Sequence, residues 1–149
     1  MSDIDRLVVD ASVGLKWVFP EPGADRARAL LAAAARGDLQ LLAPDLYIAE
    51  VTNALWKRAH LRGDLSADGA REALDRILGV LPEIVPGAAL ASQALELARA
   101  FGHPVYDCLY VALALRAGCP LVTVDRSLVR AFGPATGQVS HLDDYAVPA

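Results

Sequence analysis

The segment on which the fold depends reads HPVYDCLYVALAL and spans residues 103–115. Pro104 suits the start of a helix, and Ala and Leu recur at helical spacing until Arg116 and Gly118, so the segment is predicted to be a helix. It is apolar nearly all round, which is typical of a helix buried within a domain. Asp107 nevertheless lies in its first turn. Because burying an unpaired carboxylate is costly, this acid is expected to be paired, to cap the helix, or to bind a cation.

Length and composition indicate one globular domain, residues 1–149, that is large enough to bury a core. Hydrophobic residues make up 54% of the chain and charged residues 21%, which is unlike a disordered protein. The formal net charge of −4 provides no global attraction to nucleic acid or to anionic membranes. A polyanionic partner would therefore be held by local Arg and Lys residues or by bound cations.

Two further features concern the compartment. Cys108 and Cys119 lie far apart, without a CxxC motif or a histidine at zinc spacing, so both are expected to be buried thiols in a reducing cytosol. Residues 1–6 carry acids and no apolar signal core, and no apolar run approaches the ~20 residues of a membrane helix. A cytoplasmic protein without a membrane segment is expected.

Apolar runs and helical periodicities alternate along the chain. Strands are predicted at 4–9, 39–43, 83–86, 120–124 and 138–142. Helices are predicted at 11–18, 24–36, 45–61, 66–81, 88–100, 103–115 and 127–132. Strands separated by helices predict an α/β fold with a mostly parallel sheet.

Four acids are placed where such a fold would bring them together. Asp10 and Asp125 each follow an apolar strand, and sites in open parallel sheets form beyond the carboxyl ends of the strands. Glu50 and Asp107 lie near the N-terminal parts of two largely apolar helices, which can return to the same edge. Alternatively, Asp10 and Asp125 each cap the helix that follows.

Electrostatics indicates what a cluster of four carboxylates would do. Two carboxylates ~4 Å apart repel by about 4 kcal/mol at an effective dielectric constant of about 20. An acid–base pair needs only two such groups, whereas four favour a hard divalent metal such as Mg²⁺ or Mn²⁺, which takes oxygen ligands. Metals of this kind polarise phosphoryl oxygens and activate water, which is how phosphodiesters are hydrolysed.

The acids also lie in four segments that resemble, in order, the motifs of PIN-domain proteins of the VapC toxin type. The segments are 8–17 with Pro20-Glu21, 43–55, 106–114 and 121–126, and they span nearly the whole chain. The resemblance implies a three-layer α/β/α sandwich and a Mg²⁺-dependent endoribonuclease, with Mn²⁺ as a substitute, in which Asp10, Glu50, Asp107 and Asp125 hold the metal. It also implies a homodimer and a cognate VapB-type antitoxin. Where some relatives carry a further acid after the fourth motif, this chain has Arg126-Ser127-Leu128, so the number of bound metal ions, one or two, stays open.

Several neighbours of the acids are candidates for supporting roles. Ser12 and Thr123 lie close enough in sequence to orient a carboxylate or a metal-bound water, although Ser12 also suits a helix cap and Thr123 an ordinary strand position. Asn53 shares the helix face of Glu50. The candidates for contacts with RNA phosphates are Lys16, Lys57, Arg58, Arg126 and Arg130, each of which is equally consistent with a solvated charge. No histidine is assigned a role in catalysis.

Other functions are less compatible with the pattern. A PIN-like domain that binds RNA or protein without cutting is the main alternative, and the four intact acids argue against it. A haloacid-dehalogenase-type phosphatase would carry an Asp where this chain has Ser12. A response-regulator receiver would carry a Lys after a late strand, where neither Lys16 nor Lys57 of this chain lies. The identity of the RNA does not follow from the sequence.

Overall fold

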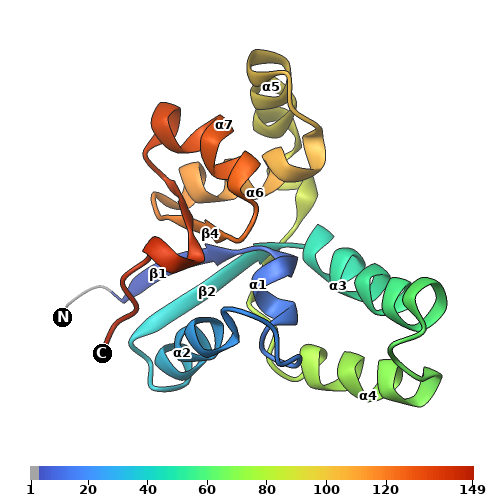
Figure 1. Ribbon diagram of the computed structural model, residues 1–149. Coiled ribbons are helices and arrows are strands. Elements are labelled where there is room, and N and C mark those ends of the chain that lie inside the picture. Colours follow the sequence, from blue (N-terminus) through green and yellow to red (C-terminus); the bar gives the residue numbers. More distant parts are fainter. Residues whose placement is uncertain (1–3) are drawn as a thin grey trace.

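The computed structural model describes residues 4–149 and contains one five-stranded sheet (Figure 1). The strands are β1 (Asp5–Val9), β2 (Leu39–Pro44), β3 (Glu83–Val85), β4 (Leu121–Thr123) and β5 (Val139–His141). Their order is β3-β2-β1-β4-β5, and the neighbouring strands run parallel. This confirms the predicted parallel α/β architecture. Residues 1–3, part of the segment without an apolar signal core, lie outside the described residues.

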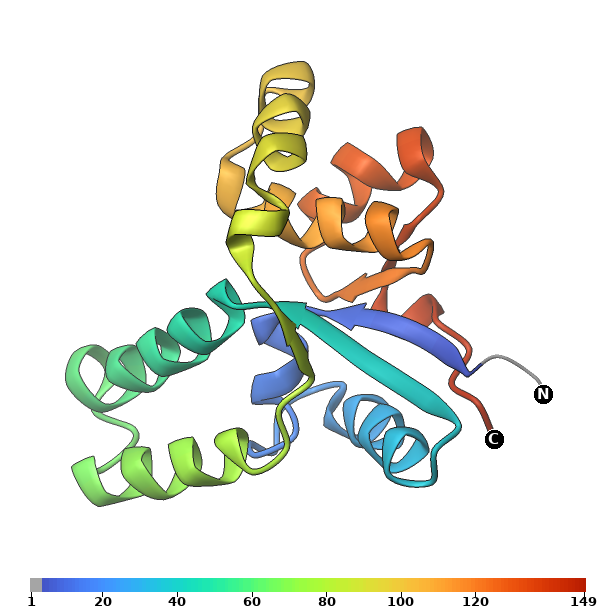
Figure 2. The same ribbon diagram turned by 180° about the vertical axis from the view of Figure 1, so that it is seen from behind.

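Helices cover both faces of the sheet (Figures 1 and 2). One face carries α5 (Ala91–Phe101), α6 (Val105–Ala117) and α7 (Arg126–Thr136). The other carries α1 (Ala11–Leu15), α2 (Ala24–Ala35), α3 (Leu46–Trp56) and α4 (Ala67–Leu78). The predicted three-layer α/β/α sandwich is therefore confirmed. Central strand β1 is buried between the layers, with Leu7, Val8 and Val9 at 0% exposure, as expected for a continuous apolar strand in a covered parallel sheet.

The segment at 103–115 forms α6, which begins after Pro104 and ends at Gly118. Its buried residues include Cys108, and the helix packs against β1, β2 and β4. Because it touches three strands, α6 fixes the position of its first turn, and hence of Asp107, relative to the centre of the sheet.

Two predicted helices differ from the structure in their extent. The helix predicted at 45–61 is α3 followed by a π-helical segment, Lys57–Arg62, which ends at Gly63 with φ +67°. The helix predicted to end at Phe132 continues as α7 to Thr136 and includes Pro134. Phe132 is fully buried against Phe101 at a centroid distance of 4.7 Å, so tertiary packing holds the helix through the proline that the sequence favours as a stop.

The order of the strands creates a switch point at the centre of the sheet. From β1 the chain builds outward through β2 to β3, then returns to β4 on the other side of β1 and ends with β5. In parallel sheets, a crevice forms at such a point beyond the carboxyl ends of the strands. Asp10 and Asp125 follow the two strands that border it. No helix within residues 4–149 has the length and apolar character required to cross a membrane.

Candidate active site

Asp10 comes directly after β1 and caps the N-terminus of α1. Its Oδ1 accepts hydrogen bonds from the hydroxyl of Ser12 at 2.5 Å and from the backbone N–H of Val13 at 3.3 Å. Its Oδ2 accepts a hydrogen bond from the hydroxyl of Thr123 at 2.5 Å. Burial raises the pKa of Asp10, and the charge of Asp107 raises it further, while these three hydrogen bonds act in the opposite direction. The structure thus places both Ser12 and Thr123 on Asp10.

Thr123 connects two of the acids. Its side chain is fully buried at the end of β4. Besides donating to Asp10, its Oγ1 accepts a hydrogen bond from the backbone N–H of Asp125 at 3.0 Å. One hydroxyl group therefore links the carboxyl ends of β1 and β4.

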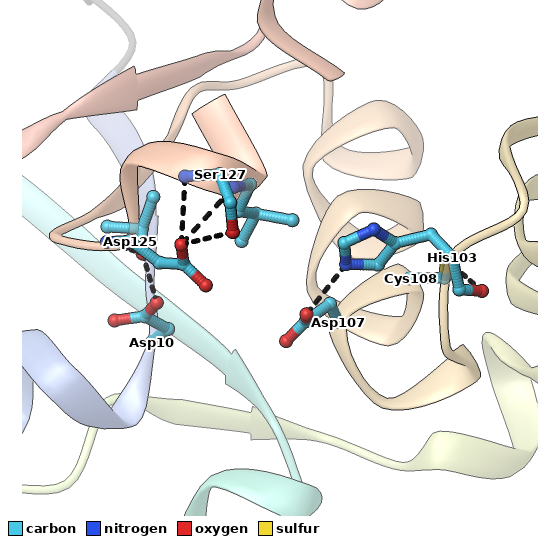
Figure 3. A network of polar contacts seen from close by, with 8 residues as sticks. Asp10, His103, Asp107, Cys108, Asp125 and Ser127 are labelled. Atoms are coloured by element: carbon cyan, nitrogen blue, oxygen red, sulfur yellow. Dashed lines mark hydrogen bonds and ion pairs between the residues drawn. The ribbon is translucent and has the colours of Figure 1, made fainter. Parts of the chain in front are cut away.

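Asp125 caps the N-terminus of α7 and is exposed. Its Oδ1 accepts hydrogen bonds from the hydroxyl of Ser127 at 2.6 Å and from the N–H groups of Ser127 and Leu128 at 2.9 and 3.3 Å (Figure 3). These bonds, the Ser127 hydroxyl foremost, lower the pKa of Asp125, and the nearby His103 contributes in the same direction. Asp125 thus does serve as a helix cap, as the alternative interpretation of the sequence expected, and it borders the crevice as well.

Asp107 lies in the first turn of α6 and contacts His103. Nε2 of His103 is 2.7 Å from Oδ2 of Asp107. From the sequence His103 received no role, although its spacing of four residues from Asp107 is the spacing at which side chains meet on a helical turn. Figure 3 shows Asp10, Asp107 and Asp125 approaching one space from three different elements.

Glu50 reaches the same region from α3. The hydroxyl of Tyr110, which is on α6, donates a hydrogen bond to Oε1 of Glu50 at 2.6 Å. Burial raises the pKa of Glu50, the hydrogen bond from Tyr110 lowers it, and the charges of Asp10 and Asp107 raise it. Three carboxylates are therefore close enough to repel one another. Tyr110 follows Asp107 by three residues on the same helix face, a spacing that identifies it in retrospect.

Tyr47 adds an unusual feature beneath the acids. Its side chain is fully buried, and its hydroxyl has no hydrogen-bond partner among residues 4–149. Gly14 makes room for it, because a Cβ atom at that position would lie 2.0 Å from the tyrosine oxygen. Burial and the charge of Asp10 raise the pKa of Tyr47. A buried hydroxyl without a partner costs about 1–3 kcal/mol, so Tyr47 is held at this place at a cost in stability.

The donor set fits a hard divalent cation. All four acids carry carboxylate oxygens, the donors that such ions prefer, and no Lys or Arg of the described chain forms an ion pair with them. In residues 4–149, no three acid, histidine or cysteine side chains already lie close enough together to hold a metal ion. A bound cation would relieve the repulsion between Asp10, Glu50 and Asp107.

The other candidate residues lie around the site rather than in it. Lys16 is buried and pairs with Glu21 at 3.2 Å, so it has little surface to offer to a phosphate. Arg126 is exposed and pairs with Asp143 at 3.7 Å. The remaining candidates are half-buried or exposed side chains, namely Asn53, Lys57, Arg58 and Arg130. Of these, Arg58 pairs with Glu21 at 3.0 Å. This leaves two exposed cations, Lys57 at the C-terminal end of α3 and Arg130 within α7.

Comparison with known sequences identifies a family. Residues 7–132 match the family model described as PIN domain. Ribonuclease VapC3 of Pyrobaculum aerophilum is 36% identical over 129 residues, which cover 85% of this chain and 95% of that protein. Ribonuclease VapC1 of Mycobacterium tuberculosis is 39% identical over 93 residues, or 61% of this chain and 67% of the relative.

Solved structures share the fold. The crystal structure of PAE2754 from Pyrobaculum aerophilum matches with a TM-score of 0.67 and 28% identity, covering 94% of this chain and 85% of that one. VapBC2 from Rickettsia felis, bound to a promoter DNA fragment, matches with a TM-score of 0.66 and 17% identity over 91% of this chain and 98% of that chain. VapC20 of Mycobacterium tuberculosis, described as a toxin that cleaves the sarcin–ricin loop, matches with a TM-score of 0.63 and 18% identity, covering 85% of this chain and 95% of that chain. The similarity of these last two is evidence for the fold alone.

Proposed function

The chain belongs to the PIN-domain family, and we propose that it is a metal-dependent endoribonuclease that acts as the toxin of a VapBC-type toxin–antitoxin pair. The observation that carries the proposal is the meeting of Asp10, Glu50 and Asp107 at the switch point of the sheet. Besides burial, the charge of Asp107 raises the pKa of Asp10, and the charges of Asp10 and Asp107 raise that of Glu50. Within residues 4–149 no Lys or Arg forms an ion pair with these acids. Because a bound cation would offset the repulsion between the carboxylates, a cluster of this kind favours cation binding.

In the proposed site Asp10, Glu50, Asp107 and Asp125 hold Mg²⁺, with Mn²⁺ as a substitute. The ion, when bound, polarises a phosphoryl oxygen and lowers the pKa of a water molecule. Ser12 and Thr123 keep Asp10 oriented, and Tyr110 does the same for Glu50. Because Asp125 already accepts three hydrogen bonds on Oδ1, its Oδ2 is the oxygen we assign to the cation.

The substrate we propose is RNA. With a net charge of −4 the chain needs local cations to hold a polyanion, and we assign phosphate contacts to Lys57 and Arg126. Asn53 lies between Glu50 and Lys57 along α3 and is exposed to the same substrate. A chain that cuts cellular RNA acts in the cytoplasm, where we place it.

We further propose two partners. A VapB-type antitoxin would neutralise the acids with an Arg or Lys side chain, or would block the RNA groove beside them. A second copy of this chain would cover the exposed apolar side chains of α5 and the start of α6, which are Leu95, Phe101, Val105 and Tyr106. The mass of the purified chain in sedimentation equilibrium tests the homodimer.

Cleavage of total RNA by the purified chain tests the proposed activity. Mg²⁺ or Mn²⁺ should support cutting, EDTA should stop it, and Asp107→Asn should lower the rate by at least about 100-fold, because it removes one metal-binding charge with little change of shape. The matched control is Asp75→Asn, the same change at an exposed position on α4, which should cut at the wild-type rate.

Two results would contradict the proposal in different ways. Cleavage that persists in EDTA, or in Asp107→Asn, would remove the metal mechanism. Binding of RNA without any cleavage in either metal would favour the non-catalytic PIN-like domain instead.

A further inference from the structure

His103 lies between α5 and α6, and its surroundings hold its ring in place. Gly102 ends α5 with φ +61°, and Pro104 precedes the first residue of α6. The edge of the ring faces Phe132 of α7, with centroids 5.3 Å apart and planes at 77°. Only 18% of the His103 side chain is exposed. The ring therefore has a defined position at the border of the acids (Figure 3).

This ring contacts Asp107 one helical turn later. The distance from Nε2 to Oδ2 is 2.7 Å. Because an ionised carboxylate only accepts hydrogen bonds, Nε2 carries the proton and donates it. Oδ1 of Asp107 has no hydrogen-bond partner in the part of the chain that the structure describes. His103 thus occupies one carboxylate oxygen and leaves the other available.

A contribution to fold stability is a weak explanation for the pair. The side chain of Asp107 is 37% exposed, and ion pairs or hydrogen bonds between such side chains one turn apart contribute little to stability. The location is more informative, since His103 lies beside two acids of the cluster: it contacts Asp107 and lowers the pKa of Asp125.

We propose that His103 is a positioning residue of the metal site, whose Nε2–H holds Asp107 in the orientation that presents its second oxygen to a divalent cation. The inference rests on the proposed function, because it requires a cation at the acids. Groups that hydrogen-bond metal-binding side chains fix their orientation, and loss of such a partner weakens metal binding roughly 10–100-fold. His103 is not itself a ligand through Nε2, since that nitrogen donates to Asp107.

Two substitutions separate the hydrogen bond from the packing of the ring. His103→Phe keeps an aromatic ring against Phe132 and removes the donor, whereas His103→Gln keeps an N–H donor near the position of Nε2. Mn²⁺ binding to each purified, metal-free protein is measured from the electron paramagnetic resonance signal of free Mn²⁺, independently of RNA cleavage. We expect the dissociation constant to rise roughly tenfold or more in His103→Phe and to return to within about threefold of wild type in His103→Gln.

The matched control is His60→Phe, the same change at an exposed histidine stacked on Trp56 in the π-helical segment. It should leave Mn²⁺ binding unchanged. Melting temperatures in EDTA show whether each variant is folded. If His103→Phe does not fold, His103→Asn replaces it, since its shorter side chain does not reach Oδ2, and weakened binding is again expected.

The outcomes distinguish the inference from the proposed function. Wild-type Mn²⁺ affinity in a folded variant that lacks the donor would overturn the role of His103 and leave the metal site standing. Equal weakening in His103→Gln and His103→Phe would also overturn it, because the donor would then be irrelevant. Failure of the wild-type chain to bind Mn²⁺ at all would overturn the proposed function, and the role of His103 with it.

Discussion

At the scale of single residues, the fold shifts the pKa values of the acids in opposite directions. Burial and mutual repulsion raise the pKa values of Asp10 and Glu50, so both carboxylates are held at a cost when they ionise. Asp125 accepts hydrogen bonds from its own helix N-terminus, which lower its pKa, so it favours the folded state when ionised. Removing the charge should therefore raise the free energy of unfolding at Glu50 and lower it at Asp125.

Glu50→Gln should stabilise the metal-free protein in a pH-dependent way. A carboxylate with a raised folded-state pKa costs nothing below its unfolded value, and its cost appears as the pH rises through the folded value. In EDTA the variant should melt with the wild type at about pH 4 and a few degrees higher at about pH 7. Gln keeps the oxygen that accepts from Tyr110, so the hydrogen bond is preserved.

Thermal unfolding followed by circular dichroism across this pH range provides the measurement. Glu96→Gln, the same change at an exposed position on α5, should follow the wild type at every pH. A Glu50→Gln variant that melts lower than the wild type at neutral pH would show that the ionised carboxylate is stabilising.

At the scale of the elements, Thr123 joins β1, β4 and α7. Its hydroxyl donates to Asp10 after β1 and accepts from the backbone of Asp125, which starts α7. Two strands that are more than 100 residues apart in sequence are thereby fixed at the ends where the acids lie. The same hydroxyl supports the fold and the orientation of the site.

Thr123→Val should destabilise the chain, because Val has the shape of Thr without the hydroxyl and leaves Oδ2 of Asp10 and the N–H of Asp125 without their partner. We expect a loss of about 1–3 kcal/mol in the free energy of unfolding, measured by urea denaturation. Thr52→Val on α3 is the control, since that hydroxyl is exposed and bonds only within its own helix. Equal losses in both variants would mean that the bridge from Thr123 adds nothing.

At the scale of the whole molecule, parallel order and helices on both faces bring acids from four separate segments to one edge (Figure 1). Asp10 and Asp125 cap α1 and α7, Asp107 lies in the first turn of α6, and Glu50 lies in α3. The repulsion among them is thus a property of the assembled fold. A bound cation should stabilise the entire domain.

Saturating Mn²⁺ should raise the melting temperature of the wild type. A ligand at 100 times its dissociation constant adds about 2.7 kcal/mol to the free energy of unfolding, which for a domain of this size corresponds to roughly 5–10 °C. Differential scanning calorimetry should show a much smaller rise in melting temperature for Asp107→Asn. The melting temperature of Asp75→Asn should rise as much as that of the wild type. Equal shifts in all three proteins would place the bound ion elsewhere.

The sequence alone was sufficient to predict most of the strands and helices and to single out the acids as candidates. Continuous apolar runs mark the strands because both faces of a parallel sheet are covered, and Asp10 and Asp125 stand out because each interrupts such a run at its end. The lengths of α3 and α7 were less predictable: α3 passes into a π-helical segment at Lys57–Arg62. The burial of Phe132 at α7 depends on its contact with Phe101 of another helix.

Only the tertiary structure decided which groups distant in sequence hold the acids. Periodicity shows which face of a helix is buried but not which strand or helix it meets, so the bond from Tyr110 to Glu50, across 60 positions, has no local signature. The same holds for Thr123 on Asp10 and for the space that Gly14 leaves to Tyr47. His103 and Asp107 are only four residues apart, yet their contact depends on a ring fixed by Phe132 from another helix. The sequence determined the charges that meet at this edge, and the order of the strands determined their partners, because hydrogen bonds form only between groups that the packing of the sheet brings within reach.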